Sequence, residues 1–266
     1  MDNDIASNTK EITMSDLINE IARKAQNRTA KKREFKQKTY LMDKALDLDV
    51  DTGFPFERAL AGEGLSLICE LRKASPESGP LIGEYSVRDL AQGFETAGAT
   101  ALSVVTEPDY YLGRDEHVTE AAKAVSLPVM KRDFVVDDYM IYEAKLLGAD
   151  AVNLICSILE PHMLMAYINI CNSLGLSAVV EVNSGREMSA ALQAGARIIC
   201  LNQNDIKEFG EAILSGIPKN VLTVSTGGIS TPDDIALLKR YKVDAAIIDD
   251  PLMKATDKKA FIEGMK

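Results

Sequence analysis

The sequence predicts an α/β protein in which eight parallel strands close into a (βα)8 TIM barrel that follows an N-terminal helical extension. The first observation is a regular alternation of short apolar runs, which have the length of buried strands, with helical patterns. Such alternation builds βαβ units around a parallel sheet, and eight units in about 200 residues have the size of a closed barrel. The eight runs are SLICEL (66–71), ALSVVT (101–106), LPVMK (127–131), AVNLIC (151–156), SAVVEV (177–182), RIICLN (197–202), VLTVST (221–226) and AAIIDD (245–250).

The second observation is a glycine followed by alanine between a helical pattern and the next strand. This pair occurs at Gly98, Gly148 and Gly195. Glycine in such a place ends a helix, because it adopts the left-handed conformation that turns the chain toward the strand. A doubly wound open sheet is the alternative fold, and it is less favoured because no GxGxxG turn follows the first strand.

The segment before the first strand predicts a tail and a helical extension. Residues 1–13 are expected to be disordered, and residues 14–266 are expected to form one barrel domain that includes the extension, 14–65. Within it, residues 14–46 predict one long or broken polar helix, because apolar side chains recur at helical spacing before a basic run. The basic run predicts a solvated helix face, and a lid over an active-site mouth is the alternative. The run consists of Arg23, Lys24, Arg28, Lys31, Lys32, Arg33, Lys36 and Lys38.

Composition restricts the classes of function. The 266 residues carry a formal net charge of −10 and are 46% hydrophobic, which suits a globular protein and argues against nucleic acid as the main partner. No apolar segment is long enough to cross a bilayer, and the N-terminus lacks the basic start and apolar run of a secretory signal. The four cysteines are too scattered for a zinc or redox motif. We therefore expect reduced thiols in a cytoplasmic protein without a metal site or a membrane partner.

Polar side chains gather where the predicted strands end, which is where barrel enzymes carry their active sites. The first strand ends in Glu70 and Arg72, the third in the Lys131–Asp133 cluster and the fifth in Glu181. Side chains from alternate strands share a layer, so these groups are expected to converge on one pocket. Two carboxylates beside a basic cluster suit general acid–base catalysis, whereas a rim of structural salt bridges is the alternative. The other strand ends contribute Val105, Thr106, Asn153, Ser157, Asn202, Asn204, Thr226, Gly228, Asp249 and Asp250.

Segments at these strand ends together resemble the indole-3-glycerol-phosphate synthase family of tryptophan biosynthesis. The resemblance is carried by CELRKASP (69–76), SVVTEPDYYLG (103–113), LPVMKRDF (127–134), YMIYEAKLLGADAVNLIC (139–156), LGLSAVVEV (174–182) and GGISTPDDI (227–235). It implies a lyase that closes the ring of 1-(2-carboxyphenylamino)-1-deoxyribulose 5-phosphate with loss of carbon dioxide and without a cofactor. That reaction requires a general acid, a general base, cations for the substrate carboxylate and a phosphate site at the last two loops.

The resemblance assigns roles to individual residues. Glu70 matches the first-strand glutamate of the acid–base machinery, Glu181 the fifth-strand glutamate and Asn202 the sixth-strand asparagine. Arg132 falls on the catalytic lysine of the family, and Lys131 is the neighbouring candidate for that role. The residues expected to bind substrate are Arg72, Ser75, Val105, Tyr111, Phe134, Asn183 and Gly228.

The chain departs from the family pattern at several of these positions. The family has lysine where this chain has Arg72 and Arg132, arginine where it has Asn204, and glutamate where it has Thr226. Arginine keeps its proton near neutral pH, so Arg132 is a poor proton donor. Lys131 is expected to point to the opposite face of the strand, unless the register slips.

The end of the eighth strand differs most. The family holds phosphate with glycine and serine where this chain has Asp249 and Asp250. Two unit charges about 4 Å apart repel by about 4 kcal/mol at an effective dielectric near 20, so these aspartates oppose a bound phosphate. Asp250 is expected instead to cap the helix that begins at Pro251, since aspartate is a favoured N-cap and proline a favoured first residue.

Two hypotheses follow. In the first, the chain is an active synthase with rearranged catalytic groups, and its partner is a small phosphorylated substrate. In the second, it is a catalytically inactive or repurposed barrel that assists other tryptophan-pathway proteins or binds a less anionic ligand. The combined loss of the acid, a base and the phosphate cradle favours the second, because catalytic groups work as a unit and fail together.

Overall fold

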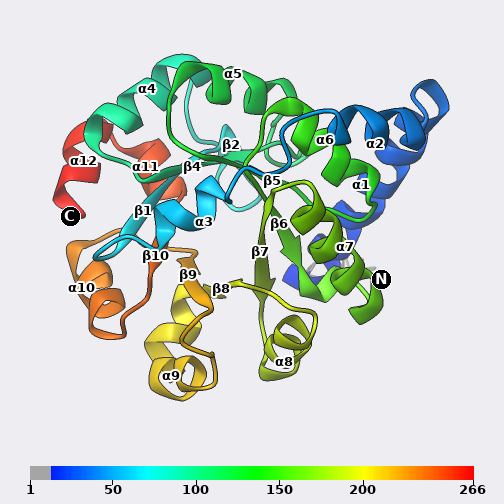
Figure 1. Ribbon diagram of the computed structural model, residues 1–266. Coiled ribbons are helices and arrows are strands. Elements are labelled where there is room, and N and C mark those ends of the chain that lie inside the picture. The colour runs from blue at the N-terminus through cyan, green and yellow to red at the C-terminus, as the bar shows by residue number, and fades with distance from the viewer. Residues whose placement is uncertain (1–12) are drawn as a thin grey trace, which may run out of the picture.

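The computed structural model describes residues 13–266, and its centre is a closed barrel of parallel strands ringed by helices (Figure 1). The strands pair in chain order, and the last pairs with the first through Ser66↔Ala245 to Cys69↔Ile248. This pairing closes the barrel and confirms the predicted (βα)8 class. The barrel strands are β1 (Ser66–Leu71), β4 (Ala101–Val105), β5 (Val129–Arg132), β6 (Ala151–Ile155), β7 (Ser177–Val182), β8 (Ile198–Asn202), β9 (Leu222–Thr226) and β10 (Ala245–Ile248).

The predicted strand limits hold for the first and fifth runs and shift by one or two residues elsewhere. The third strand begins at Val129 and includes Arg132, which pairs with Val105 of β4. The eighth ends at Ile248, because Asp250 already belongs to the following helix. Two short strands in the loop after β1, namely β2 (Ala74–Ser75) and β3 (Gly79–Pro80), form an antiparallel hairpin.

Helices cover the outside of the barrel, and an apolar core fills the space between them and the strands. The predicted glycine ends are confirmed at Gly98 and Gly148, which end their helices in the left-handed region with φ 89°. Gly195 has φ 87° just after its helix. The covering elements are α4 (Val87–Ala97), α5 (Glu116–Ala124), α6 (Tyr139–Leu147), the 3-10 turn η1 (Cys156–Ile158), α7 (Pro161–Ser173), α8 (Gly185–Gln193), α9 (Gln203–Ser215), α10 (Pro232–Arg240), α11 (Asp250–Lys254) and α12 (Lys258–Gly264).

A short helix before β1, α3 (Pro55–Leu60), closes one end of the barrel interior. Its Phe56 and Leu60 are fully buried and belong to the same apolar cluster as Ile68 and Met130, which point into the barrel. The cluster is built mainly from the first halves of the strands. The carboxyl ends of the strands therefore remain available for polar side chains.

The N-terminal extension forms two helices, α1 (Met14–Phe35) and α2 (Lys38–Leu46), so the predicted polar helix is broken at Lys36 and Gln37. Thr13 begins α1 as its N-cap and accepts a hydrogen bond from the backbone N–H of Asp16, whose side chain accepts one from Thr13 in return. The rest of the tail predicted at 1–13 lies outside the described residues.

The basic run of the extension binds the barrel rather than facing only solvent. Arg28 pairs with Glu107 and Asp109 in the loop after β4. Lys32 lies between Asp115 and Glu143, at 2.5 Å and 2.8 Å. Arg33 and Lys38 pair with Asp137 and Asp138 in the loop after β5. The interpretation of this run as a solvated face holds for the exposed Arg23, Lys31 and Lys36. It is wrong for the four residues above, because the barrel loops carry complementary carboxylates that the run alone does not reveal.

All four cysteines are buried free thiols. Across residues 13–266, no helix is both long and apolar enough to cross a membrane.

We predict that Phe56→Ala destabilises the protein by about 3–5 kcal/mol, because it leaves a cavity where the ring fills the closed end of the barrel. Urea unfolding followed by circular dichroism measures the loss. The matched control is Phe35→Ala, since Phe35 is 90% exposed and its replacement is expected to change stability by less than about 0.5 kcal/mol. Equal effects of the two variants would contradict the packing described for α3.

Candidate active site

A cavity of about 210 Å³ opens at the carboxyl ends of the barrel strands. Most of the residues predicted from the sequence line it, and Met14 and Ile18 of α1 cover one side. The start of α1 thus takes part in the site, which sequence reasoning found only as an alternative. The predicted residues that line the cavity are Arg72, Val105, Tyr111, Arg132, Phe134, Glu181, Asn183 and Asn202.

Glu70 lies fully buried beside this cavity and accepts hydrogen bonds from two guanidiniums. Arg72 Nε donates to its Oε1 at 2.7 Å, and Arg132 Nη1 donates to its Oε2 at 2.9 Å. Ser103, its partner across β1 and β4, donates to Oε2 at 2.7 Å. Burial alone would raise the pKa of Glu70, but Arg132 and Arg72 lower it below its ordinary value, so the carboxylate is ionised at neutral pH.

Arg132 is the side chain that joins the alternate strands. It contacts Glu70 on β1, Glu181 Oε2 on β7 at 3.3 Å and Thr226 Oγ1 on β9 at 3.3 Å. Burial opposes its charge, yet Glu70 and Glu181 raise its pKa well above the ordinary value. Arg132 therefore remains a cation that can donate hydrogen bonds but cannot release a proton.

Lys131 lies on the opposite face of β5, outside this cavity. Its ammonium donates to Asp133 at 2.6 Å and to Thr106 at 2.8 Å, and it pairs with Asp115 at 3.1 Å. The pKa of Lys131 is raised by these carboxylates in spite of full burial. Alternation of side chains along a strand separates Lys131 from Glu70 and Glu181, since neither register slip nor bulge occurs in β5.

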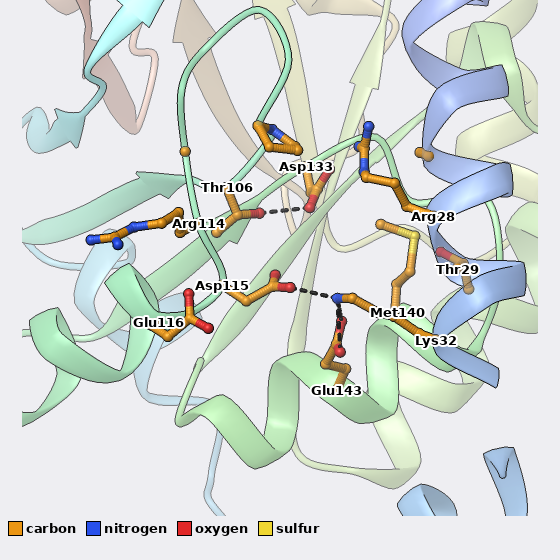
Figure 2. A pocket seen from close by; sticks show the side chains of 13 residues that line it. Arg28, Thr29, Lys32, Thr106, Arg114, Asp115, Glu116, Asp133, Met140 and Glu143 are labelled. Carbon is orange, nitrogen blue, oxygen red and sulfur yellow. Dashed lines mark hydrogen bonds and ion pairs between the residues drawn. The ribbon is translucent and has the colours of Figure 1, made fainter. Parts of the chain in front are cut away.

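Beside Lys131 lies a second cavity, of about 240 Å³, between α1 and the loops after β4 and β5. Figure 2 shows Lys32 of α1 reaching between Asp115 and Glu143, while Thr106 bonds to Asp133 above them in the view. Cations and carboxylates neutralise one another across this cavity. The ion pairs around this cavity therefore attach α1 to the barrel.

The end of β10 is tied to the loop after β1. Arg72 Nη1 donates to Asp250 Oδ1 at 3.0 Å, and Ser75 Oγ donates to Asp250 Oδ2 at 2.6 Å. Asp249 Oδ2 lies 4.0 Å from Arg72 Nη2. Asp249 is the N-cap residue of α11 and Asp250 is its first residue, with no side-chain cap bond. The predicted capping by Asp250 is therefore wrong, because Arg72 and Ser75 bind its carboxylate. No local sequence signal links position 250 to positions 72 and 75.

One wall of the cavity is aromatic and apolar. The rings of Tyr111 and Phe134 have centroids 6.3 Å apart, and the Arg72 guanidinium lies 5.1 Å from the Tyr111 centroid. Burial raises the pKa of Tyr111 to about 12, so its hydroxyl is neutral. Asn153 also lines the cavity, and its Oδ1 accepts a hydrogen bond from the backbone of Asp133. Together with Val105 these groups can hold a planar aromatic ligand.

The ends of β8 and β9 form the edge of the site, where Asn202 lines the cavity. Asn202 Oδ1 accepts a bond from the backbone of Asn204, which fixes the start of α9. Gly227 and Gly228 adopt φ 86° and 75°, which favours glycine. A Cβ on Gly227 would come within 3.0 Å of Asn202 Nδ2, so the turn and the asparagine pack closely. Neither Gly228 nor Ser75 lines the cavity itself.

Comparison with known proteins gives a family and a fold. The family described as "Indole-3-glycerol phosphate synthase" matches residues 17–265. A protein of that name from Lachnoclostridium phytofermentans is 40% identical over 219 residues, which are 80% of this chain and 81% of the relative. One from Ruminiclostridium cellulolyticum is 39% identical over 225 residues, 82% of this chain and 86% of the relative.

Solved structures that resemble the chain show the same barrel fold. The crystal structure of a KGPDC from Streptococcus mutans has a TM-score of 0.56 and 17% identity, and the match covers 76% of this chain and 95% of that one. At this identity the likeness concerns the fold alone.

We predict that Lys131→Met destabilises the protein by about 3–5 kcal/mol, because it leaves buried Asp133 without its cation. Urea unfolding measures the effect. The control Lys44→Met removes an exposed lysine that pairs with the exposed Asp47, and its unfolding midpoint is expected to stay that of the wild type. A Lys131→Met variant of wild-type stability would contradict the assigned ion-pair cluster.

We predict that the stabilising contribution of Glu70 disappears in acid. Its pKa in the folded protein lies below the ordinary value of 4.5, so the contribution is complete above that pH and is lost as the pH falls through the folded pKa. Glu70→Gln should therefore be less stable than wild type at pH 7, by about 3–5 kcal/mol, and the gap should narrow well below pH 4.5. Chemical unfolding of both proteins across this pH range is the measurement, and a gap that does not change would contradict it.

Proposed function

Because the chain belongs to the indole-3-glycerol phosphate synthase family, we propose that the cavity around Arg132 is where it carries out the reaction of that family. Homology at 34–40% identity assigns indole-3-glycerol phosphate synthase activity in tryptophan biosynthesis. The family match over residues 17–265 is the observation that carries the proposal, since this range includes every barrel strand.

The reaction converts a 1-(2-carboxyphenylamino)-1-deoxyketose into an indole. A carbon–carbon bond forms between the ring carbon that bears the carboxylate and the ketone carbon, whose oxygen takes up a proton. Loss of carbon dioxide then restores the aromatic ring. The new hydroxyl leaves as water after a second proton is added, and the neighbouring methylene group gives up one proton. One proton is consumed overall.

The arrangement of charges supports a role for each group around Arg132. The fixed guanidinium can donate hydrogen bonds to the ketone oxygen as it becomes negative, which is electrostatic stabilisation rather than proton transfer. Glu181 is the partly accessible carboxylate, with 22% of its side chain exposed. We assign it the role of the general base that removes the methylene proton. Glu70 is bound by three donors, and we assign it the positioning of Arg132.

The apolar wall and Arg72 support binding of the aromatic end of the substrate. Tyr111 and Phe134 provide ring faces, and Arg72 lies beside Tyr111 where it can meet a carboxylate on the bound ring. The start of α1 shields the same side through Ile18. Shielding from water strengthens the interaction of Arg132 with developing charge.

A second candidate function is a barrel that binds a ligand of this type without converting it. One observation favours it, because Arg132 cannot release the proton that the ketone and the leaving hydroxyl require. The two candidates differ in whether an indole is formed, while binding at the cavity is common to both.

We predict that the purified chain forms an indole product from the 1-(2-carboxyphenylamino)-1-deoxyketose, and that Glu181→Gln lowers kcat by about 10²–10⁴-fold because the base is lost. Indole fluorescence of the product follows the reaction, with the 5-phosphate and the unphosphorylated compound assayed side by side. The control is Glu208→Gln on the exposed surface of α9, which is expected to keep wild-type kcat.

Two results would overturn the catalytic proposal. Failure to form indole from either compound would leave the binding function as the correct candidate. Turnover that Glu181→Gln does not reduce would remove Glu181 from the mechanism.

A further inference from the structure

We propose that Asn153 determines which substituted aromatic rings this cavity prefers, because its amide is an unused hydrogen-bond donor in the wall that holds the ring. The inference rests on the proposed function, since it concerns the aromatic end of the same phosphorylated substrate. It assigns the preference to a ring that carries a hydrogen-bond acceptor, such as a hydroxyl group, over one that carries a methyl group of similar size. The burial of Asn153, the fixed orientation of its amide and its place in the aromatic wall support it.

Asn153 is a buried polar residue that faces the cavity. It follows Ala151 by two residues on β6, so it points to the same inward side as that member of the interior apolar cluster. Only 3% of Asn153 is exposed, and it lines the cavity. Within residues 13–266 its Nδ2 donates no hydrogen bond, and this atom is open to the cavity rather than enclosed by protein. Buried amides are almost always hydrogen-bonded, so a molecule in the cavity must supply the acceptor.

The amide of Asn153 is held in one orientation. Its Oδ1 accepts a hydrogen bond from the backbone N–H of Asp133 at 2.8 Å, and the amide NH2 group could not accept that bond in its place. Asp133 is itself fixed, because its carboxylate accepts hydrogen bonds from Lys131 and Thr106, both at 2.6 Å. The NH2 group of Asn153 is therefore oriented before a ligand arrives, and a donor of this kind loses little entropy when it binds.

Asn153 lies at the end of the aromatic wall that is farther from Arg72. The strands β1, β4, β5 and β6 follow one another around the barrel, and they or the loops after them carry Arg72, Tyr111, Phe134 and Asn153 in that order. In the proposed function Arg72 meets the carboxylate of the bound ring, so the opposite edge of the ring lies toward Asn153. That edge consists of positions 4 and 5 of the phenyl ring, which bear neither the carboxylate nor the amine.

A hydroxyl and a methyl substituent differ in what they offer to Nδ2 of Asn153. The hydroxyl oxygen accepts its hydrogen bond, whereas the methyl group leaves a buried donor without a partner. Sites that hydrogen-bond a substrate group discriminate strongly against analogues that lack it. Arg132 reaches across the barrel to Glu70 and Glu181, so the reacting atoms lie away from this edge of the ring. The substituent therefore acts on binding, and its effect is expected in KM rather than in kcat.

The decisive experiment compares hydroxy and methyl derivatives of 1-(2-carboxyphenylamino)-1-deoxyribulose 5-phosphate, substituted at ring position 4 or 5. For the wild-type protein we expect kcat/KM of the hydroxy compound to exceed that of the methyl compound about tenfold at one of these positions. Asn153→Leu removes the donor and should reverse the preference. The control Asn220→Leu makes the same replacement at an exposed position before β9, and should keep the wild-type ratio. A ratio near one at both positions, or a preference that Asn153→Leu leaves unchanged, would overturn the inference.

Binding of the products separates this inference from the proposed function. Calorimetric titration of the wild-type protein with indoleglycerol phosphate that bears the hydroxyl or the methyl group on the corresponding ring carbons requires no catalysis. Tighter binding of the hydroxy product without turnover of any substrate would support the role of Asn153 and overturn the catalytic function. Turnover without a preference for the hydroxy compound, or binding of neither product, would overturn the role of Asn153. The wild-type measurements decide the matter even if Asn153→Leu does not fold.

Discussion

The site depends on one buried carboxylate that is shared by two guanidiniums. Glu70 is fully enclosed, and an ionised group in such a place is tolerated only when partners replace the water it has lost. Arg72 and Arg132 donate hydrogen bonds to this carboxylate in place of water, and Ser103 donates a third. Each arginine must in turn be balanced, so the pairing extends outward to Glu181 on one side and to Asp250 on the other.

This chain of ion pairs links Arg72, Arg132 and Asp250 to the buried Glu70. An arginine at position 72 brings a forked cation to the edge of the barrel, and a carboxylate at position 250 binds one of its arms. The other arm faces Glu70 and approaches Asp249. Arg72, Arg132 and Asp250 are thus neighbours in one electrostatic network around Glu70, and the charge of each depends on its partners. A change at one of them alone would leave a buried charge without its partner.

The two faces of β5 carry side chains with different roles: one face forms structural ion pairs and the other lines the cavity. Lys131 and Arg132 are adjacent in sequence and both are buried cations, yet they belong to different clusters. Lys131 joins Asp133 and Asp115 beneath α1, where further ion pairs attach the extension to the barrel. Arg132 points into the cavity. The attachment of α1 brings Met14 and Ile18 to the cavity wall. The ion-pair cluster of Lys131 therefore also shapes the cavity into which Arg132 points.

The sequence by itself determined the fold class, because the alternation of strand-length apolar runs with glycine-ended helices has a local physical cause at every step. It also determined that Glu70, Arg132 and Glu181 belong to alternate strands, since strand order fixes which side chains share a layer. Only the tertiary structure decided which charged groups pair. The local sequence predicted that the carboxylate of Asp250 caps a helix. In the structure Arg72 and Ser75, which are distant in sequence, bind it instead. The basic run of α1 had a local interpretation as a solvated face, but the acidic loops of the barrel lie against it. Ion pairs of this kind depend on distances across the closed barrel, and those distances arise only when the last strand meets the first.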